Sequence, residues 1–139
     1  MAASGLIDTG AILALLDRKD QWHGRCADAF VNLRTPLATS AAVLTEVFHL
    51  IGNQSGAIAS AWGFLHSGAV TVRPIDDADL PALEALMRQY ADRPMDFADA
   101  TLVHLARRES LTTVFTIDHD DFETYRIEGR RRFRIVPAR

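Results

Sequence analysis

The chain has 139 residues, 48% of them hydrophobic and 24% charged, and this length and composition predict one globular domain that spans residues 1–139. A net charge of −3 gives no general indication of nucleic-acid binding, and the single cysteine, Cys26, excludes an intrachain disulfide and is typical of a reducing cytoplasm. The sequence begins without the basic and apolar segments of a signal peptide, and no run approaches the roughly 20 apolar residues of a membrane span. We therefore expect a cytoplasmic protein without a membrane anchor.

Short β-like runs alternate with helical patterns along the first half of the chain. Apolar residues recur at helical spacing between these runs, and Thr35-Pro36 separates two of the segments. We expect strands at residues 5–7 and 37–39, and helices at residues 11–16, at residues 21–33 and from an N-cap at Ser40 to Ile51.

The second half continues the alternation. Arg93-Pro94 is expected to stop one helix, and the run Thr-Val-Phe-Thr-Ile at residues 113–117 is the clearest strand in the chain. We expect helices at residues 56–65, 80–90 and 96–108, and strands at residues 69–72, 113–117 and 133–136.

This order predicts a three-layer α/β/α sandwich around a mostly parallel sheet, because strands that alternate with helices pair through right-handed crossovers. In such a sheet, ligands gather beyond the carboxyl ends of the strands. Two acids take that position, since Asp8 follows the first strand and Asp118 follows the strand at residues 113–117. Either acid alone is well explained as a helix N-cap. Both together are expected to face one crevice.

Three more acids border buried helix faces. Glu46 lies beside the apolar stripe of its helix, where a carboxylate is poorly solvated, although it could also reach water from the edge. Asp96 and Asp99 share one face at the start of a helix, where an N-cap and a first-turn acid are the competing interpretation. Asp120 and Asp121 are interpreted as helix acids and not as ligands.

At least four acids without basic neighbours in the sequence would repel one another in one crevice unless a divalent cation neutralised them. Oxygen ligands alone select Mg²⁺ or Mn²⁺ over Zn²⁺, and the five histidines form no metal-binding pattern. The pattern indicates metal-assisted hydrolysis of phosphodiesters. The C-terminal segment, residues 126–139, carries six arginines against one acid, and it could contact phosphate, a partner protein or only solvent.

Four segments in order give the chain a resemblance to the PIN-domain nucleases, in particular to VapC-type toxins of bacterial toxin–antitoxin pairs. They are Leu-Ile-Asp-Thr-Gly-Ala-Ile-Leu-Ala-Leu-Leu at residues 6–16, Thr-Glu-Val at 45–47, Asp-Phe-Ala-Asp-Ala-Thr-Leu-Val at 96–103 and Val-Phe-Thr-Ile-Asp-His-Asp-Asp-Phe at 114–122. The likeness extends from Leu6 to Pro137. One departure is Gly10, which stands where a serine or another small polar residue is often found.

The resemblance implies an endoribonuclease that uses Mg²⁺ or Mn²⁺, acts on structured RNA such as tRNA, forms a homodimer and is masked by a VapB-like antitoxin. By matching positions, four acids would hold the metal and the attacking water: Asp8, Glu46, Asp99 and Asp118. Asp96 is an additional candidate ligand, and the hydroxyls of Thr9 and Thr116 would support the ligands. Arg130, Arg131 and Arg132 would contact either RNA or the antitoxin.

Other protein classes also gather acids at the ends of parallel strands. Phosphoacceptor receiver domains and haloacid-dehalogenase-type phosphatases use a lysine beside those acids, and the only lysine here, Lys19, does not follow a late strand. The Walker A pattern of nucleotide-binding enzymes is absent. A PIN fold that has lost catalysis and only binds RNA or protein remains the non-enzymatic alternative, against which the four intact acids argue.

Overall fold

The computed structural model describes residues 2–93 and 95–139. Within these residues, the centre of the molecule is a five-stranded sheet in the order β3-β2-β1-β4-β5, and all neighbouring strands are parallel. The strands are β1 (Leu6–Ile7), β2 (Leu37–Thr39), β3 (Val70–Val72), β4 (Thr113–Phe115) and β5 (Arg134–Val136).

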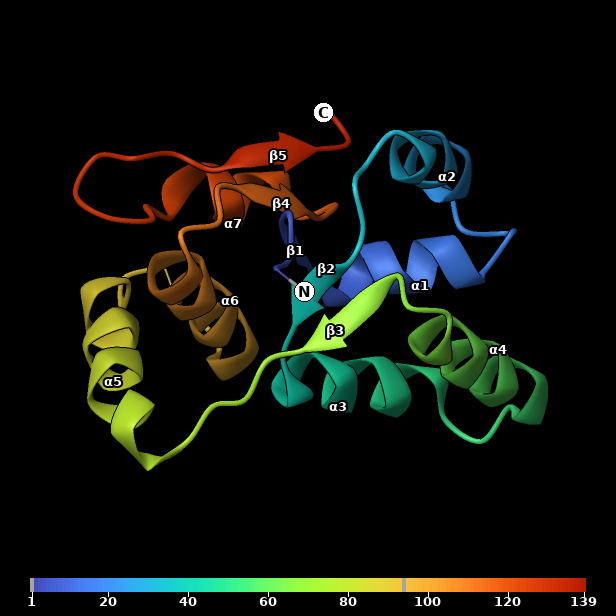
Figure 1. Ribbon diagram of the computed structural model, residues 1–139, viewed down its shortest axis with the longest axis horizontal. Helices are drawn as coiled ribbons and strands as arrows, with labels where there is room; N and C mark the ends of the chain where they lie inside the picture. Colours follow the sequence, from blue (N-terminus) through green and yellow to red (C-terminus); the bar gives the residue numbers. More distant parts are fainter. Residues whose placement is uncertain (1, 94) are drawn as a thin grey trace.

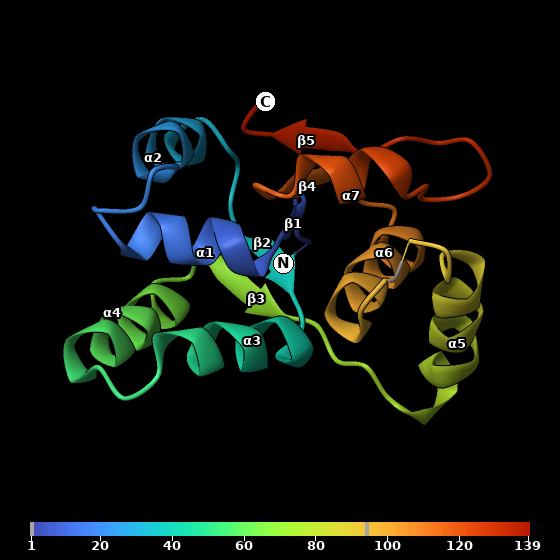
Figure 2. The same ribbon diagram turned by 180° about the vertical axis from the view of Figure 1, so that it is seen from behind.

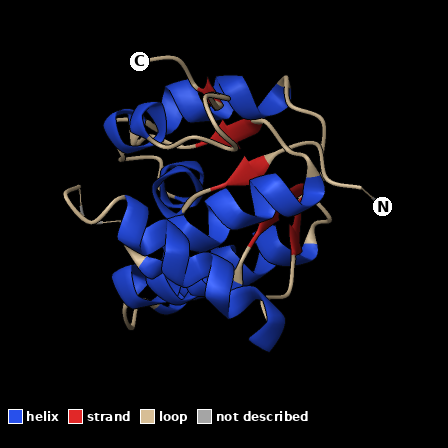
Figure 3. Ribbon diagram, turned by 90° about the vertical axis from the view of Figure 1, so that its left-hand side faces the viewer, coloured by secondary structure: helices blue, strands red, loops and turns tan. Residues whose placement is uncertain are grey.

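Helices cover both faces of the sheet (Figure 1). In that view α1, α2 and α4 lie on one side and α5 and α6 on the other, with α3 along the lower edge, and Figure 3 shows the short strands enclosed among helices. The predicted α/β/α fold with a parallel sheet is confirmed. The helices are α1 (Thr9–Leu16), α2 (His23–Val31), α3 (Ala41–Ile51), α4 (Ser55–His66), α5 (Leu80–Gln89), α6 (Phe97–Glu109) and α7 (His119–Thr124), and a 3₁₀ turn, η1 (Asp77–Asp79), precedes α5.

The middle strand, β1, is covered on both faces. Leu6 and Ile7 are fully buried, and they pair with Val114 and Phe115 of β4, which are fully buried too. Continuous apolar sequence is the pattern of a strand with helices on both sides, as here. Because β1 and β4 are adjacent and parallel, the residues that follow them come out at the same edge of the sheet.

Side-chain caps start the helices that surround this edge. Ser40 Oγ accepts from the backbone N–H of Val43, as expected of the cap of α3. Asp96 and Asp118 cap α6 and α7 in the same way, whereas Asp8, at the N-cap of α1, accepts from the N–H of the next residue. Such a cap contributes about 1 kcal/mol to stability, so the capping interpretation of these acids holds at the same time as any other role.

Some element ends differ from the prediction. The strand expected at residues 113–117 ends at Phe115. The N–H of Thr116 still donates to the carbonyl of Val136, but its hydroxyl accepts from the N–H of Asp118, a bond that turns the chain after Thr116. The turn η1 was not expected, although Asp76 and Asp79 form a capping box there. Pro94, expected to stop a helix, lies outside the described residues, and α5 ends at Gln89. Among the described residues, no helix has the length and apolar character to cross a membrane.

Candidate active site

A pocket of about 310 Å³ opens at the carboxyl ends of β1 and β4. It brings together every acid that the sequence analysis selected, from four separate elements. Asp8 and Asp118 lie just beyond β1 and β4, Glu46 comes from α3, and Asp96 and Asp99 come from the start of α6. The described lining residues are Asp8, Thr9, Gly10, Glu46, Asp96, Asp99, Ile117, Asp118 and Asp121.

The acids lie at different depths. Asp8 and Asp99 are buried, at 7% and 8% exposure, and form the floor of the pocket. Glu46 and Asp121 are half-buried, and Asp96 and Asp118 are exposed at its mouth. A ligand would therefore meet the outer carboxylates first and the two buried ones at the bottom.

Asp8 is held by two hydrogen bonds. The backbone N–H of Thr9 donates to Oδ1 at 2.7 Å, and Thr116 Oγ1 donates to Oδ2 at 3.0 Å. Burial raises the pKa of Asp8 to about 6, with smaller contributions from the charges of Asp118 and Glu46, while the two hydrogen bonds oppose the shift. The carboxylate is therefore fixed in place but costly to ionise.

The two threonines predicted to support the acids both contact them. Thr9 Oγ1 donates to Glu46 Oε1 at 2.8 Å. Thr116 Oγ1, while donating to Asp8, accepts from the backbone N–H of Asp118 at 3.0 Å. One fully buried hydroxyl thus links the acids that follow β1 and β4.

Asp99 has the most perturbed pKa in the pocket. Burial is the largest cause, the charges of Asp8 and Asp96 add to it, and the pKa rises to about 8. Its Oδ2 accepts a 2.8 Å hydrogen bond from the hydroxyl of Tyr125, which is fully buried. Burial and the neighbouring carboxylate raise the pKa of Tyr125 far above its usual value, so this phenol stays protonated and donates.

Asp118 and Asp121 extend the cluster through the first turn of α7. Partial burial, the hydrogen bond to Asp121 and its charge raise the pKa of Asp118 to about 6. Carboxylate oxygens of Asp99, Asp118 and Asp121 lie within 4.8 Å of one another, a separation that one cation could bridge. Interpreting Asp121 only as a helix acid was therefore incomplete, because the same turn places it in the pocket.

Asp96 both caps a helix and lines the pocket. Its Oδ1 accepts from the backbone N–H of Asp99 at 2.8 Å and so caps α6, and the residue also lines the mouth of the pocket. The cap leaves Oδ2 as the oxygen that could bind a ligand.

The donor set fits a hard divalent cation. All ionisable groups among the described lining residues are carboxylates, and no histidine, cysteine, lysine or arginine stands among them. The raised pKa values of Asp8, Asp99 and Asp118 mean that proximity and burial disfavour their combined charge, and a bound cation would remove that penalty. Oxygen donors alone match Mg²⁺ or Mn²⁺.

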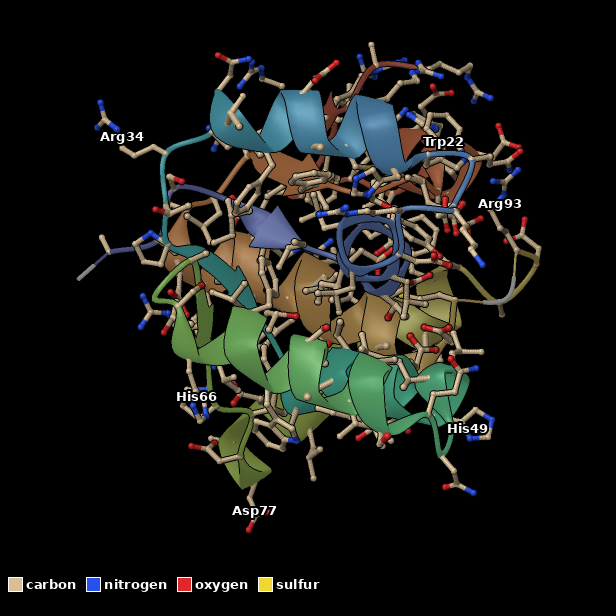
Figure 4. All side chains as sticks on the ribbon, turned by 90° about the vertical axis from the view of Figure 1, so that its right-hand side faces the viewer. Trp22, Arg34, His49, His66, Asp77 and Arg93 are labelled. Atoms are coloured by element: carbon tan, nitrogen blue, oxygen red, sulfur yellow. The ribbon has the colours of Figure 1, made fainter. Side chains whose placement is uncertain are left out.

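The histidines lie elsewhere, as expected of surface or hydrogen-bonded core residues. His23 and His119 contact the backbone carbonyls of Ala14 and Pro137, and His104 contacts Asp79. Figure 4 shows the labelled His49 and His66 pointing outward from the surface.

The arginine-rich segment is not part of the pocket. It leads into β5 at Arg134, which pairs with Thr113 at the amino end of β4, whereas the acids lie at the carboxyl ends. Figure 2 shows the loop between α7 and β5 at the edge of the molecule, away from the starts of α1 and α6. Arg130, Arg131 and Arg132 are exposed on this loop.

Gly10 allows a close contact at the pocket wall. A Cβ at this position would lie 2.8 Å from Cγ1 of Ile117, closer than carbon atoms tolerate. At Gly10 the sequence has glycine where a small polar residue is often found. Ile117 fills the space that a side chain at this position would take. Sequence inspection could not find this pair, because the two residues are far apart in the chain.

Comparisons with known proteins find similar sequences and a similar structure. A family model described as the PIN domain matches residues 5–128. Ribonuclease VapC26 of Mycobacterium tuberculosis is 28% identical over 134 residues, which is 95% of this chain and 99% of that protein. The crystal structure of Mycobacterium tuberculosis VapC20, described as a toxin that cleaves the sarcin-ricin loop, aligns with a TM-score of 0.74 at 23% identity, over 84% of this chain and 92% of that one.

Proposed function

Because the chain belongs to the PIN domain family, we propose that it is a metal-dependent endoribonuclease and the toxin of a toxin–antitoxin pair. The observation that carries the proposal is the convergence of six carboxylates from four elements on one pocket that contains no basic side chain among its described residues. Similarity to Ribonuclease VapC26 over nearly the full length of both chains supports RNA as the substrate.

Asp8, Glu46, Asp99 and Asp118 are the proposed ligands of the cation and of the attacking water, with Asp96 and Asp121 as further oxygen donors at the mouth. The proposed ion is Mg²⁺ or Mn²⁺, which when bound lowers the pKa of water and stabilises negative charge on a phosphate. The buried pair, Asp8 and Asp99, anchors the site, because Thr9, Thr116 and Tyr125 fix these carboxylates by hydrogen bonds.

The residues of the chain have three tasks in the proposed reaction. The outer carboxylates accept hydrogen bonds from a water and orient it in line with the phosphorus atom. One of them then takes up a proton of this water as its oxygen bonds to phosphorus, while the phosphorus–oxygen bond to the leaving ribose oxygen breaks and that oxygen takes a proton from solvent. Ile117 and Gly10 form the apolar wall that keeps bulk water from that side of the pocket.

The arginine-rich loop is proposed to contact RNA at a distance from the scissile bond. Arg130, Arg131 and Arg132 lie toward the amino ends of the strands, so they would bind flanking phosphates, or the antitoxin, rather than the reacting one. Replacing all three with Gln should weaken RNA binding and flatten its salt dependence. An unchanged salt slope would assign the loop to the antitoxin or to solvent.

A homodimer is proposed to form over the outer face of α5 and the start of α6. Leu80, Met87 and Phe97 are 36–48% exposed there, around a hollow of about 430 Å³. Exposed apolar side chains that gather in this way are typical of protein interfaces. Met87→Glu should yield a monomer by light scattering, and a dimer of unchanged stability would place the interface elsewhere.

The remaining partners follow from the proposed toxin role. The site would be masked in the cytoplasm by a VapB-like antitoxin, and the substrate would be structured RNA such as tRNA. A segment that masks an acidic pocket should present a basic side chain to it.

The test is cleavage of a total RNA pool by purified protein with Mg²⁺ or Mn²⁺, with EDTA as one control. Asp99→Asn should remove most cleavage, and Asp28→Asn, a change of an exposed acid on α2, should not. Cleavage that persists in EDTA, or in Asp99→Asn, would contradict the proposal. A folded protein that binds Mn²⁺ but cuts no RNA would favour a binding module.

A further inference from the structure

We propose that Tyr125 positions Asp99 for cation binding, an inference that rests on the proposed metal site. The contact that carries it is direct. The phenol hydroxyl donates to Oδ2 of Asp99 at 2.8 Å, and both side chains are buried, so water does not replace either partner. Asp99 lies in the first turn of α6, and Tyr125 directly follows α7, 26 positions later.

The Tyr125 ring is held by its neighbours. It makes edge-to-face contacts with Tyr90 and Phe122 at centroid distances of 5.0 and 5.3 Å. The backbone N–H of Tyr125 donates to the carbonyl of Asp121 at 2.9 Å and closes the end of α7. A ring packed in this way cannot swing, so the hydroxyl occupies one place relative to α6.

The chain that follows Tyr125 is tied to α6 as well. The guanidinium of Arg107, near the end of α6, donates to the carbonyls of Arg126 and Ile127. The backbone N–H of Arg126 donates to the hydroxyl of Tyr90 at 2.9 Å. These bonds fix the segment after α7 against α6, and the Tyr125 hydroxyl extends the same connection to the acid at the start of that helix.

In Asp99, one of the two carboxylate oxygens is therefore engaged in a hydrogen bond. A phenol bound to Oδ2 restricts rotation of the carboxylate group and leaves Oδ1 as the oxygen available to a cation in the pocket. A neutral donor fixes the group without cancelling its charge, whereas a lysine or arginine in the same place would compete with the metal. Partners that orient a metal ligand in this way typically change metal affinity by 10- to 100-fold.

The experiment compares the two tyrosines of the chain. Tyr125→Phe removes the hydroxyl on Asp99 and keeps the ring, while Tyr90→Phe removes a hydroxyl of the same aromatic cluster that accepts from the backbone N–H of Arg126. Mn²⁺ affinity is measured without RNA, from the electron paramagnetic resonance signal of free Mn²⁺. We expect Tyr125→Phe to weaken Mn²⁺ binding by about 10-fold and Tyr90→Phe to change it by less than about 2-fold.

A double-mutant cycle separates positioning from general loosening of the fold. In an Asp99→Asn background, Tyr125→Phe should no longer alter Mn²⁺ affinity, because its effect acts through that carboxylate. Additive losses, equal losses in the two tyrosine variants, or unchanged affinity in Tyr125→Phe would each overturn the proposal. Because the readout needs no RNA, a protein that cuts nothing but shows the expected affinities would contradict the proposed nuclease and support the role of Tyr125.

A measurement on the unsubstituted protein guards against a variant that fails to fold. With ¹³Cζ-labelled tyrosine, the chain gives two phenol signals, assigned through Tyr90→Phe. Titration with Mg²⁺ should shift the Tyr125 signal and leave that of Tyr90 in place. Equal shifts of both, or no shift of either at saturating Mg²⁺, would count against the proposal.

Discussion

Replacing Thr116 with valine tests whether its hydroxyl links the two strand-end acids. The substitution keeps the shape of a fully buried side chain and removes an Oγ1 that donates to Asp8 at 3.0 Å and accepts from the N–H of Asp118 at 3.0 Å. A hydrogen bond to an ionised group contributes about 1.5–3 kcal/mol, and a neutral one about 1. In EDTA at pH 8, where both bonds are lost, we therefore expect the free energy of unfolding to fall by about 2.5–4 kcal/mol.

The effect should depend on pH. Because the Thr116 hydroxyl lowers the pKa of Asp8 against the effect of burial, it favours the ionised form. At pH 5 the Asp8 carboxyl is mostly protonated, so both lost bonds are neutral and the loss should shrink to about 2 kcal/mol. The acid limb of the cleavage profile should also move to higher pH, because the pKa of Asp8 rises further above 6.

Thr39→Val is the matched control. Thr39 is a fully buried strand threonine whose hydroxyl donates to the carbonyl of Ile7 at 3.1 Å, a neutral acceptor. Its replacement should cost about 1 kcal/mol at both pH values and leave the cleavage profile in place. Urea unfolding at pH 5 and pH 8, with RNA cleavage from pH 5 to 9, makes the comparison. Equal losses in the two variants at both pH values, with superimposable profiles, would refute the role assigned to Thr116.

Three further predictions concern the charge and shape of the pocket. In EDTA the protein should lose stability as the pH rises from about 4 to about 8, because the raised pKa of Asp99 makes the folded state bind its proton more tightly than the unfolded state. At a concentration 100 times the Kd measured at pH 8, Mg²⁺ should raise the free energy of unfolding by about 2.7 kcal/mol at pH 8. The same concentration should raise it much less at pH 5, and melting curves in which the Mg²⁺ effect does not depend on pH would contradict this. Gly10→Ala should lose about 1–2 kcal/mol by crowding Ile117, whereas Gly24→Ala, with open space at its Cβ, should gain up to 1, as urea unfolding would measure. Asp121→Asn should weaken Mn²⁺ binding about 10-fold, and an unchanged affinity would return this residue to a purely helical role.

The parts of the site that the sequence predicted are those that depend on sheet topology. Asp8 and Asp118 could be expected at one edge, because parallel strands place the residues that follow them on the same side. The strand ends were less predictable. Thr116 has high strand propensity and was placed inside a strand, and its N–H does donate to Val136, but its hydroxyl accepts from the N–H of Asp118 and turns the chain there.

The parts that the sequence did not predict depend on how helices pack. Asp121 sits in the first turn of α7, where an acid is favoured by the helix dipole alone, so no local signal distinguishes a cap from a ligand. Tyr125 reaches Asp99 only because the segment after α7 is bound to α6. No sequence periodicity predicts either contact. An aromatic residue in an apolar segment is expected to be buried, but the sequence does not indicate which group its hydroxyl will bind.

The chemistry of the supporting groups explains why the acids remain available to a ligand. The contacts that fix Asp8, Glu46 and Asp99 come from hydroxyls and a backbone N–H, with Thr9, Thr116 and Tyr125 as the side-chain donors. Among the described residues, the cation that reaches the cluster is Arg93, which pairs with the outer acid Asp121 at 3.3 Å and is 44% exposed, so that solvent screens it. A buried arginine or lysine would have stabilised the folded protein and neutralised the site permanently. Neutral donors instead leave the cluster without a buried counter-charge, so a divalent cation that binds there relieves the burial and repulsion that raise the pKa of Asp8 and Asp99.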